Sequence, residues 1–389
     1  MTPEAYLEHV RALLPALRER VAYTEQLRRL PDETFKDFQE AGLFRALQPK
    51  RYAGYELDPG AFYQAVMDVG DACGSSAWIL GVVGVHNWQL ALFPPQAQED
   101  VWGEDTSTQL STSLAPTGTV ERAEGGYRLS GRWSFSSGCD FCQWAVLGAV
   151  VPPTHEGASP DRLALLVPRQ DYTIDDIWHV IGLCGTGSKD IVVESALVPG
   201  YRTFSYREAF EIRSPGLAIH ESPLYRLPFG CVFPYGIAAP AIGVALGALR
   251  HFRDEAKTRV WTRDGARVAE DPFVQFRLAE AAAEVDAARD RLLRSFADMM
   301  QLARTGQEIP LAHRARYRWE AAHAVGWSVH AVDRLFEASG GRAIFLNNPI
   351  QRAWRDVHAM RAHAGNNPEK MATIFGRSEF GLPPQDLAF

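Results

Sequence analysis

An alternating run of aromatic and hydroxyl side chains, Gly131 to Gly138 (GRWSFSSG), is the part of the sequence best suited to holding a ligand. A strand of this pattern that ends at a glycine fits a flat ring system. Phe135 offers the face of its ring, and Ser137 offers a hydrogen bond beside it. A solvated strand face without any ligand produces the same pattern, so both interpretations stay open at this point.

Two histidines lie in apolar helical surroundings, where an imidazole can hold or transfer a proton near neutral pH. His86 stands in the run VHNWQLALF, and His363 stands in MRAHAG near the end of the chain. For each, the alternative is a core histidine whose ring is satisfied by other protein groups. No metal site is predicted, because His358 and His363 do not share one helical face well and no HExxH motif accompanies them.

Motifs for nucleotide binding and covalent catalysis are missing from the sequence. The run GLCGTGSKD, residues 182–190, resembles a glycine-rich loop, but a strand pattern follows it where a helix N-terminus is needed. We therefore predict a hairpin turn there, and no binding of a nicotinamide cofactor in the usual way. No nucleophile elbow of the GxSxG type occurs. Cys139 and Cys142 form a CxxC without a second pair, so we predict ordinary half-buried thiols.

The composition predicts a globular protein without nucleic-acid or membrane partners. The 389 residues are 46% hydrophobic and 22% charged, and the formal net charge of -7 gives no general attraction to phosphates. The longest apolar stretch, Cys73 to Phe93, is interrupted by His86, Asn87 and Gln89, so we predict a buried helix. The N-terminal segment lacks the apolar core of a secretory signal, and the five cysteines form no disulfide framework. A cytoplasmic location is expected.

The hydrophobic period divides the chain into helical and strand regions and predicts an α+β fold. Residues 1–104 repeat apolar positions at three and four, which indicates an N-terminal helical domain. Residues 105–205 change to a period of two, which indicates a central β domain. Residues 206–233 read as a linker or lid, and residues 234–389 read as a C-terminal helical bundle. A sheet packed against a bundle creates clefts at the seams, where we expect the ligand site.

These elements, in this order, resemble the acyl-CoA dehydrogenase fold. In that family a strand of the form G-x-K-x-W-I-T places an aromatic and a hydroxyl against a flavin, and Gly131, Phe135 and Ser137 fall at the same offsets. The run GGRAIFLNNPIQRAWRDVHAM, residues 340–360, resembles the family's late segment GG…P…RxxRDxR. The resemblance implies an N-terminal helical domain, a central β-barrel-like domain and a C-terminal four-helix bundle.

The same resemblance implies flavin contacts from several segments. Thr112, Ser113 and Leu114 stand where the dehydrogenases carry a loop that touches the flavin ring. Gly340 and Gly341 are expected at the phosphate end of the flavin, in this or a neighbouring subunit. The remaining expected contacts are Trp78 at the ring pocket, Phe135, Ser136 and Ser137 on the strand, Arg259 at the phosphate, and Phe273 with Gln275, which resemble a segment that reaches a neighbour's cofactor. For Arg259 a surface arginine is the alternative. The family implies a homotetramer.

One departure from the dehydrogenases changes the expected reaction. They carry a glutamate base shortly after the pair that corresponds to Arg355 and Asp356, whereas here Ala362 stands at that position with His363 beside it. This substitution resembles the two-component, or group D, flavin-dependent monooxygenases of the same fold. The likeness is to the oxygenase components that hydroxylate p-hydroxyphenylacetate and, more closely, phenolic secosteroids, and it extends over nearly the whole chain.

The resemblance therefore implies an oxygenase that takes reduced FMN or FAD from a separate NAD(P)H:flavin reductase. With O2 it would hydroxylate a small phenolic substrate through a flavin C4a-hydroperoxide. His363 would contact the phenolic oxygen and favour its ionisation, His86 would lie on the substrate side, and Ser137 would hydrogen-bond near flavin N5. The alternatives are N- or S-oxygenation by the same fold, a true acyl-CoA dehydrogenase, and a flavin carrier without turnover.

Overall fold

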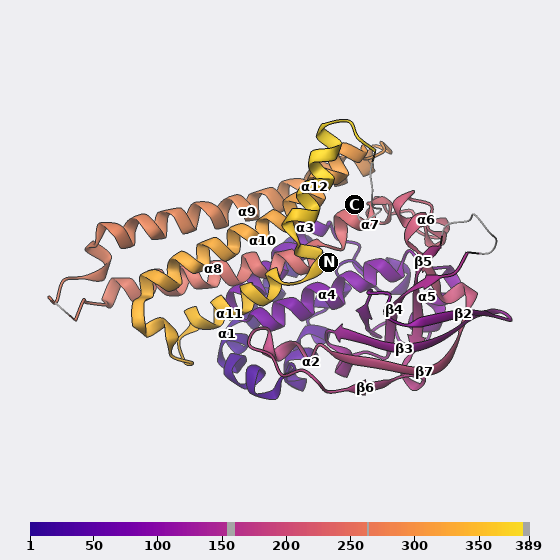
Figure 1. Ribbon diagram of the computed structural model, residues 1–389, viewed down its shortest axis with the longest axis horizontal. Helices are drawn as coiled ribbons and strands as arrows, with labels where there is room; N and C mark the ends of the chain where they lie inside the picture. The colour runs from indigo at the N-terminus through magenta and orange to yellow at the C-terminus, as the bar shows by residue number, and fades with distance from the viewer. Residues whose placement is uncertain (154–159, 263, 384–389) are drawn as a thin grey trace.

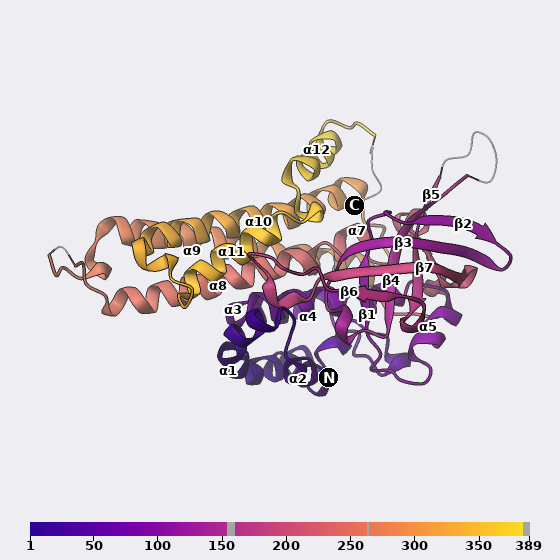
Figure 2. The same ribbon diagram turned by 60° about the horizontal axis from the view of Figure 1, so that its bottom comes forward.

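The computed structural model of the chain describes residues 1–153, 160–262 and 264–383 and has the α+β architecture that the hydrophobic period predicts. Figure 1 shows the β-sheets gathered at one end of the molecule and long helices that extend from them to the other end. The N-terminal helices pack along one side of these long helices, which the turned view in Figure 2 shows. Sheets, N-terminal helices and long helices therefore meet near the middle of the molecule.

The long helices of the C-terminal part pack side by side (Figure 1). Their bounds are α8 (Tyr235–Thr258), α9 (Pro272–Arg304), α10 (Leu311–Ser339), α11 (Pro349–Arg361) and α12 (Pro368–Glu379). Among the described residues, the helical stretch Phe229–Thr258 is the one long and apolar enough to cross a membrane, and 78% of its most apolar window is buried inside the protein. Packing in the core accounts for that apolar character.

The N-terminal helices share one hydrophobic core with the bundle. They are α1 (Pro3–Leu27), α2 (Asp32–Glu40), α3 (Pro59–Ala72), α4 (Gly74–Leu90) and α5 (Pro95–Trp102). Every residue of α4 is buried, which confirms the predicted core helix. Close approach depends on glycine: a Cβ at Gly81 of α4 would lie 2.4 Å from the carbonyl oxygen of Gly236 in α8. A larger side chain there would force the two helices apart.

The described strands form two four-stranded sheets with the orders β1-β4-β5-β8 and β2-β3-β7-β6. Their bounds are β1 (Leu110–Ser113), β2 (Thr119–Ala123), β3 (Gly126–Ser136), β4 (Trp144–Val151), β5 (Asp161–Pro168), β6 (Thr173–Asp175), β7 (Lys189–Pro199) and β8 (Thr203–Ser205). The sheets enclose a second, smaller core around Trp133 and Leu165, which are fully buried. Only β1 and β4 pair in parallel among these strands.

Strand β3 departs from the regular alternation that the sequence predicts. Its pairing with β7 shifts between Trp133 and Ser136, as in a β-bulge. Phe135 has a φ of +67°, a left-handed conformation that bulky residues rarely adopt. The bulge turns the Phe135 ring outward, where 69% of the residue is exposed, while Trp133 stays in the core. The segment expected to hold a ring system is therefore a strained bulge and not a flat strand face.

Residues 206–233, predicted as a linker or lid, contain the short helices α6 (Tyr206–Phe210) and α7 (Phe229–Val232). Buried aromatic side chains donate hydrogen bonds to backbone carbonyls of this segment. Trp88 Nε1 donates to the carbonyl of Leu224 at 3.0 Å, and the Tyr63 hydroxyl donates to the carbonyl of Val232 at 2.7 Å. The bounds of the four predicted segments, and a lid function for residues 206–233, stay predictions.

Candidate active site

Three segments that are distant in the sequence meet at the seam between the bundle, α4 and the end of β3. The ring of His363, which follows α11, lies 5.8 Å from the ring of Trp78 on α4, with 59° between their planes. Trp78 Nε1 donates a hydrogen bond to Oγ of Ser137, just beyond β3, at 3.0 Å. The structure thus brings together three of the side chains that the sequence predicts for the ring and substrate pocket.

The turn after α11 determines which ring nitrogen of His363 carries the proton. The backbone N–H of Gly365 donates to Nδ1 of His363 at 2.9 Å, so the neutral ring carries its proton on Nε2. The side chain is accessible to solvent, although many protein atoms surround it. Desolvation, together with the charge of Arg318, lowers the pKa of His363 to about 4. At neutral pH His363 is therefore an uncharged hydrogen-bond donor.

Both ring nitrogens of His86 are engaged by the protein. Nδ1 donates to the carbonyl of Leu110 at 2.8 Å, and the hydroxyl of Thr112 lies 2.9 Å from Nε2, to which it donates. His86 is 2% exposed, and burial lowers its pKa to about 4, so the ring is neutral. With both ring nitrogens engaged, His86 orients the Thr112 hydroxyl by accepting its proton.

Around Ser137 the structure adds two hydroxyls that the sequence analysis did not single out. Oγ of Ser137 lies 2.7 Å from Oγ of Ser188, and that atom lies 2.7 Å from Oγ1 of Thr186. Both residues belong to the run GLCGTGSKD, which leads into β7. The hydroxyls of Thr186 and Ser188 are the signal in this run, although its glycines are the more conspicuous feature.

The other residues predicted at the flavin ring differ in what they expose. Ser136 is fully buried and donates to Oγ of Ser111 at 3.0 Å, so its hydroxyl proton is engaged by the protein. Ser113 Oγ donates to the carbonyl of Ser134 at 2.6 Å. Thr112 and Leu114 are partly exposed. The exposed Phe135 ring makes a T-shaped contact with Trp178, with 6.1 Å between the ring centroids and 88° between the ring planes. Thr112, Leu114 and Phe135 are thus the accessible members of this set.

A second group of predicted residues lies elsewhere. A Cβ at Gly340 would lie 3.7 Å from Nη2 of Arg259, so these two are neighbours, and Gly341 follows directly. Phe273, at the start of α9, is 77% exposed. The loop between α8 and α9 lies at the end of the bundle away from the sheets (Figure 1). Within one chain this group is therefore separate from the group around His363 and Ser137.

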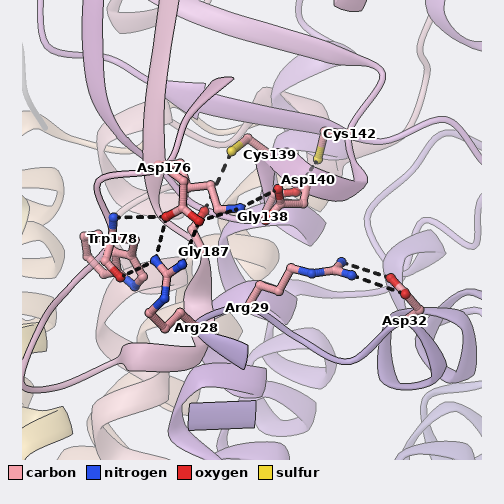
Figure 3. A network of polar contacts seen from close by, with 11 residues as sticks. Arg28, Arg29, Asp32, Gly138, Cys139, Asp140, Cys142, Asp176, Trp178 and Gly187 are labelled. Atoms are coloured by element: carbon pink, nitrogen blue, oxygen red, sulfur yellow. Dashed lines mark hydrogen bonds and ion pairs between the residues drawn. The ribbon is translucent and has the colours of Figure 1, made fainter. Parts of the chain in front are cut away.

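A polar network, drawn in Figure 3, includes Gly138 and Gly187, which follow Ser137 and precede Ser188 in the sequence. Arg28, at the end of α1, makes a two-pronged contact with Asp176 at 2.7 and 2.9 Å and also donates to the carbonyl of Trp178. The thiols of Cys139 and Cys142 contact the carbonyls of Gly187 and Gly138. Burial raises the pKa of Cys139 to about 12, so this thiol stays protonated. Among the described residues, no three His, Cys, Asp or Glu side chains gather to hold a metal ion.

Two family models match the chain: the acyl-CoA dehydrogenase N-terminal domain over residues 3–108 and the acyl-CoA dehydrogenase C-terminal domain over residues 235–368. The chain is 45% identical to the flavin-dependent monooxygenase oxygenase subunit HsaA of Rhodococcus jostii strain RHA1, with 98% of this chain and 99% of that protein covered. It is 36% identical to the FADH(2)-dependent resorcinol hydroxylase oxygenase component of Rhizobium sp. strain MTP-10005, with 95% and 92% covered.

The p-hydroxyphenylacetate 3-hydroxylase oxygenase component of Acinetobacter baumannii is 32% identical, with 97% of this chain and 89% of that protein covered. Among solved structures, the 3-HSA hydroxylase from Rhodococcus sp. RHA1 superposes with a TM-score of 0.95 at 44% identity, over 99% of this chain and 98% of that one. The similarity therefore extends from end to end and includes the strands between the two family models.

Proposed function

The chain belongs to the acyl-CoA dehydrogenase family as the oxygenase component of a two-component flavin-dependent monooxygenase that hydroxylates aromatic substrates, and on this premise we propose that its substrate is a phenol held at His363. The observation that carries the proposal is the Nε2–H of a neutral His363, directed by the Gly365 contact. A hydrogen bond from this donor stabilises the ionised form of a phenolic oxygen. The ring carbons of a phenolate are richer in electrons and more easily hydroxylated.

The residues at the seam fit a flavin ring. Phe135 exposes an aromatic ring on a strained bulge, Ser137 adds a hydroxyl two residues further along, and Thr112 adds a hydroxyl from β1. When bound, reduced flavin supplies the electrons that activate O2, and a separate reductase component supplies the reduced flavin. We propose that Phe135 and Leu114 contact the ring, that Ser137 hydrogen-bonds it, and that Trp78 closes one wall of the pocket.

Thr112, whose hydroxyl is held by His86, is a second candidate contact for the ligands. Because the Thr112 proton is donated to His86, the Thr112 oxygen faces the pocket as an acceptor. We propose that Thr112 accepts a hydrogen bond from a ligand and that His86 is a positioning residue without ligand contact. The dehydrogenase reaction is disfavoured, because Ala362 offers no base where that branch of the family carries a glutamate.

We infer a homotetramer in the cytoplasm. The separation of Arg259 and Gly340 from the ring site supports it, since a flavin bound at Ser137 can reach a second such group only in another subunit. Exposed apolar side chains at Phe273, Ile344 and Leu346 support the same conclusion, because isolated chains rarely expose such groups together.

Co-expression of Arg259→Ala and His363→Asn chains tests the shared site. The mixed oligomers should recover part of the hydroxylation activity that each variant lacks by itself. If no activity is recovered and the protein has a monomeric mass in solution, the shared site is contradicted.

The experiment for the reaction supplies photoreduced FMN or FAD, O2 and a panel of phenols, anilines and thioethers to the purified protein. We expect a phenol to gain one oxygen atom from 18O2. Exclusive oxygenation of the nitrogen or sulfur compounds would replace the phenol proposal by N- or S-oxygenation. Bleaching of bound oxidised flavin by an acyl thioester would instead support dehydrogenase chemistry.

A further inference from the structure

We infer that Thr186 and Ser188 fix the direction of the Ser137 hydroxyl and thereby make the site select reduced over oxidised flavin. The inference rests on the proposed flavin contact of Ser137. It concerns residues that carry no role in the proposed reaction, and it follows from the order in which hydrogen bonds can be donated along one chain of hydroxyls.

The chain of hydroxyls ends on a backbone carbonyl. Thr186 Oγ1 lies 3.0 Å from the carbonyl oxygen of Leu183, which can only accept, so Thr186 donates its proton there. Ser188, 2.7 Å from Thr186, must then donate to it. Ser137, 2.7 Å from Ser188, must in turn donate to Ser188. The opposite direction would leave oxygen lone pairs of Thr186 and Leu183 facing each other at 3.0 Å in a buried place, which is unfavourable.

At the other end, the indole N–H of Trp78 donates to Ser137 Oγ at 3.0 Å. An indole nitrogen cannot accept, so the direction of this bond is also fixed. The Ser137 oxygen therefore gives its proton to Ser188, takes one from Trp78, and keeps a single free lone pair. Toward any further ligand, Ser137 is an acceptor.

Burial and backbone contacts keep the chain of hydroxyls in place. Thr186 is 1% exposed and Ser188 is 3% exposed, so water does not compete for their protons. The N–H of Gly138, next to Ser137, donates to the carbonyl of Thr186 at 3.1 Å. The Cys139 thiol contacts the carbonyl of Gly187, between Thr186 and Ser188 (Figure 3). The turn that follows Ser137 is therefore held against residues 186–187 by these two contacts, next to the hydroxyls.

The fixed acceptor distinguishes the two forms of the cofactor. N5 of reduced flavin carries a hydrogen and donates, whereas N5 of oxidised flavin carries a lone pair and accepts. Ser137 thus pairs with the reduced form and opposes a lone pair of the oxidised form. In an oxygenase that receives reduced flavin from another protein, this preference favours entry of the useful form and release of the spent one.

The experiment measures dissociation constants for photoreduced and oxidised FMN and FAD, under anaerobic conditions, in the wild type, Ser188→Ala and Thr186→Val. Either substitution frees the Ser137 proton to turn toward the flavin. We expect the preference for reduced flavin to fall by about tenfold, mainly through tighter binding of the oxidised form. The same tenfold change lowers the two-electron potential of the bound flavin by about 30 mV.

Ser328→Ala is the matched control, because it removes a buried serine hydroxyl that donates within α10, away from the site. In Ser137→Ala the preference should already be lost, and adding Ser188→Ala to it should change nothing more. An unchanged or increased preference in both Ser188→Ala and Thr186→Val overturns the inference. A wild type that binds neither flavin overturns the proposed flavin site itself, which is a distinguishable failure.

Discussion

The backbone N–H of Gly365 donates to Nδ1 of His363 at 2.9 Å, and this contact decides which proton the histidine can offer. Asn366 anchors the same turn, since its Nδ2 donates to the carbonyls of Ile237 in α8 and Met360 in α11, at 3.1 and 2.8 Å. The orientation of His363 is thus set by the backbone of a short turn held between two helices. A mobile ring would serve a phenolic oxygen less well, because the donor would have to be ordered at each turnover.

Replacing His363 by Asn tests the donor directly. We expect the rate of phenol hydroxylation to fall by about 100-fold or more, because the shorter amide cannot reproduce the reach of Nε2. Affinity for reduced flavin should stay unchanged, and release of H2O2 per NADH consumed should rise. His358→Asn is the control, since His358 lies on α11 with its Nε2 at 2.9 Å from Asp333, outside the site. Unchanged coupling in His363→Asn would remove this residue from the mechanism.

Arg318 should influence the reaction through the charge state of His363. Its guanidinium donates to the carbonyl of Gly365, and its charge is the second cause, after desolvation, of the lowered pKa of His363. In Arg318→Met the pKa of His363 should rise from about 4 toward its ordinary value while remaining below it, because desolvation persists. NMR titration of labelled histidine measures this shift. Arg316→Gln, an exposed change on the same helix, should leave the titration where it is.

Parts of this site were open to prediction from the sequence because they depend on local patterns. The alternation of GRWSFSSG identified Phe135 and Ser137, and the hydrophobic period located the helices and strands, since each must bury one face. The bulge at Phe135 has no signal in the sequence, because glycine is the usual sign of a left-handed residue and this position is a phenylalanine. The alternation of residue types in the sequence does not indicate that the Phe135 ring turns out of the strand.

Other features depend on partners distant in the sequence. Whether His86 was free or satisfied could not be predicted, because its partners Leu110 and Thr112 lie on β1, beyond α5. The link from Ser137 to Ser188 joins two turns that only the pairing of β3 with β7 brings together. Tertiary contacts therefore decided the direction of each hydrogen bond, while the sequence indicated only which groups could make one.

The buried His86 predicts acid-sensitive stability. Its folded-state pKa of about 4 lies below the unfolded value of 6.5, so the unfolded chain binds an additional proton between these values and stability falls as the pH drops through them. The effect of a shift of this size is roughly 3 kcal/mol when fully developed. Asp356 has the opposite effect on the pH dependence. Burial raises its pKa to about 6, so the stabilisation that comes from its protonation in the folded chain is lost as the pH rises through that value. Melting temperatures at about pH 5 and about pH 7 should differ less in His86→Gln than in the wild type.

Phe135→Gly should separate ligand binding from stability. The left-handed backbone of Phe135 costs roughly 1–2 kcal/mol, whereas glycine adopts it freely at an entropic cost of about 0.5–1 kcal/mol. Because the ring is 69% exposed, little burial is lost, and the free energy of unfolding should stay the same or rise by up to about 1 kcal/mol.

Affinity for reduced flavin should nevertheless fall by about tenfold in Phe135→Gly, because an aromatic wall of the pocket disappears. Ala53→Gly, at a remote position with a φ of +61°, is the matched control and should change stability in the same direction without any effect on flavin. Urea unfolding and flavin titration of both variants measure the two quantities. A Phe135→Gly protein that unfolds more easily, yet binds flavin as the wild type does, would assign this ring to the fold and leave the strain at the bulge without a function.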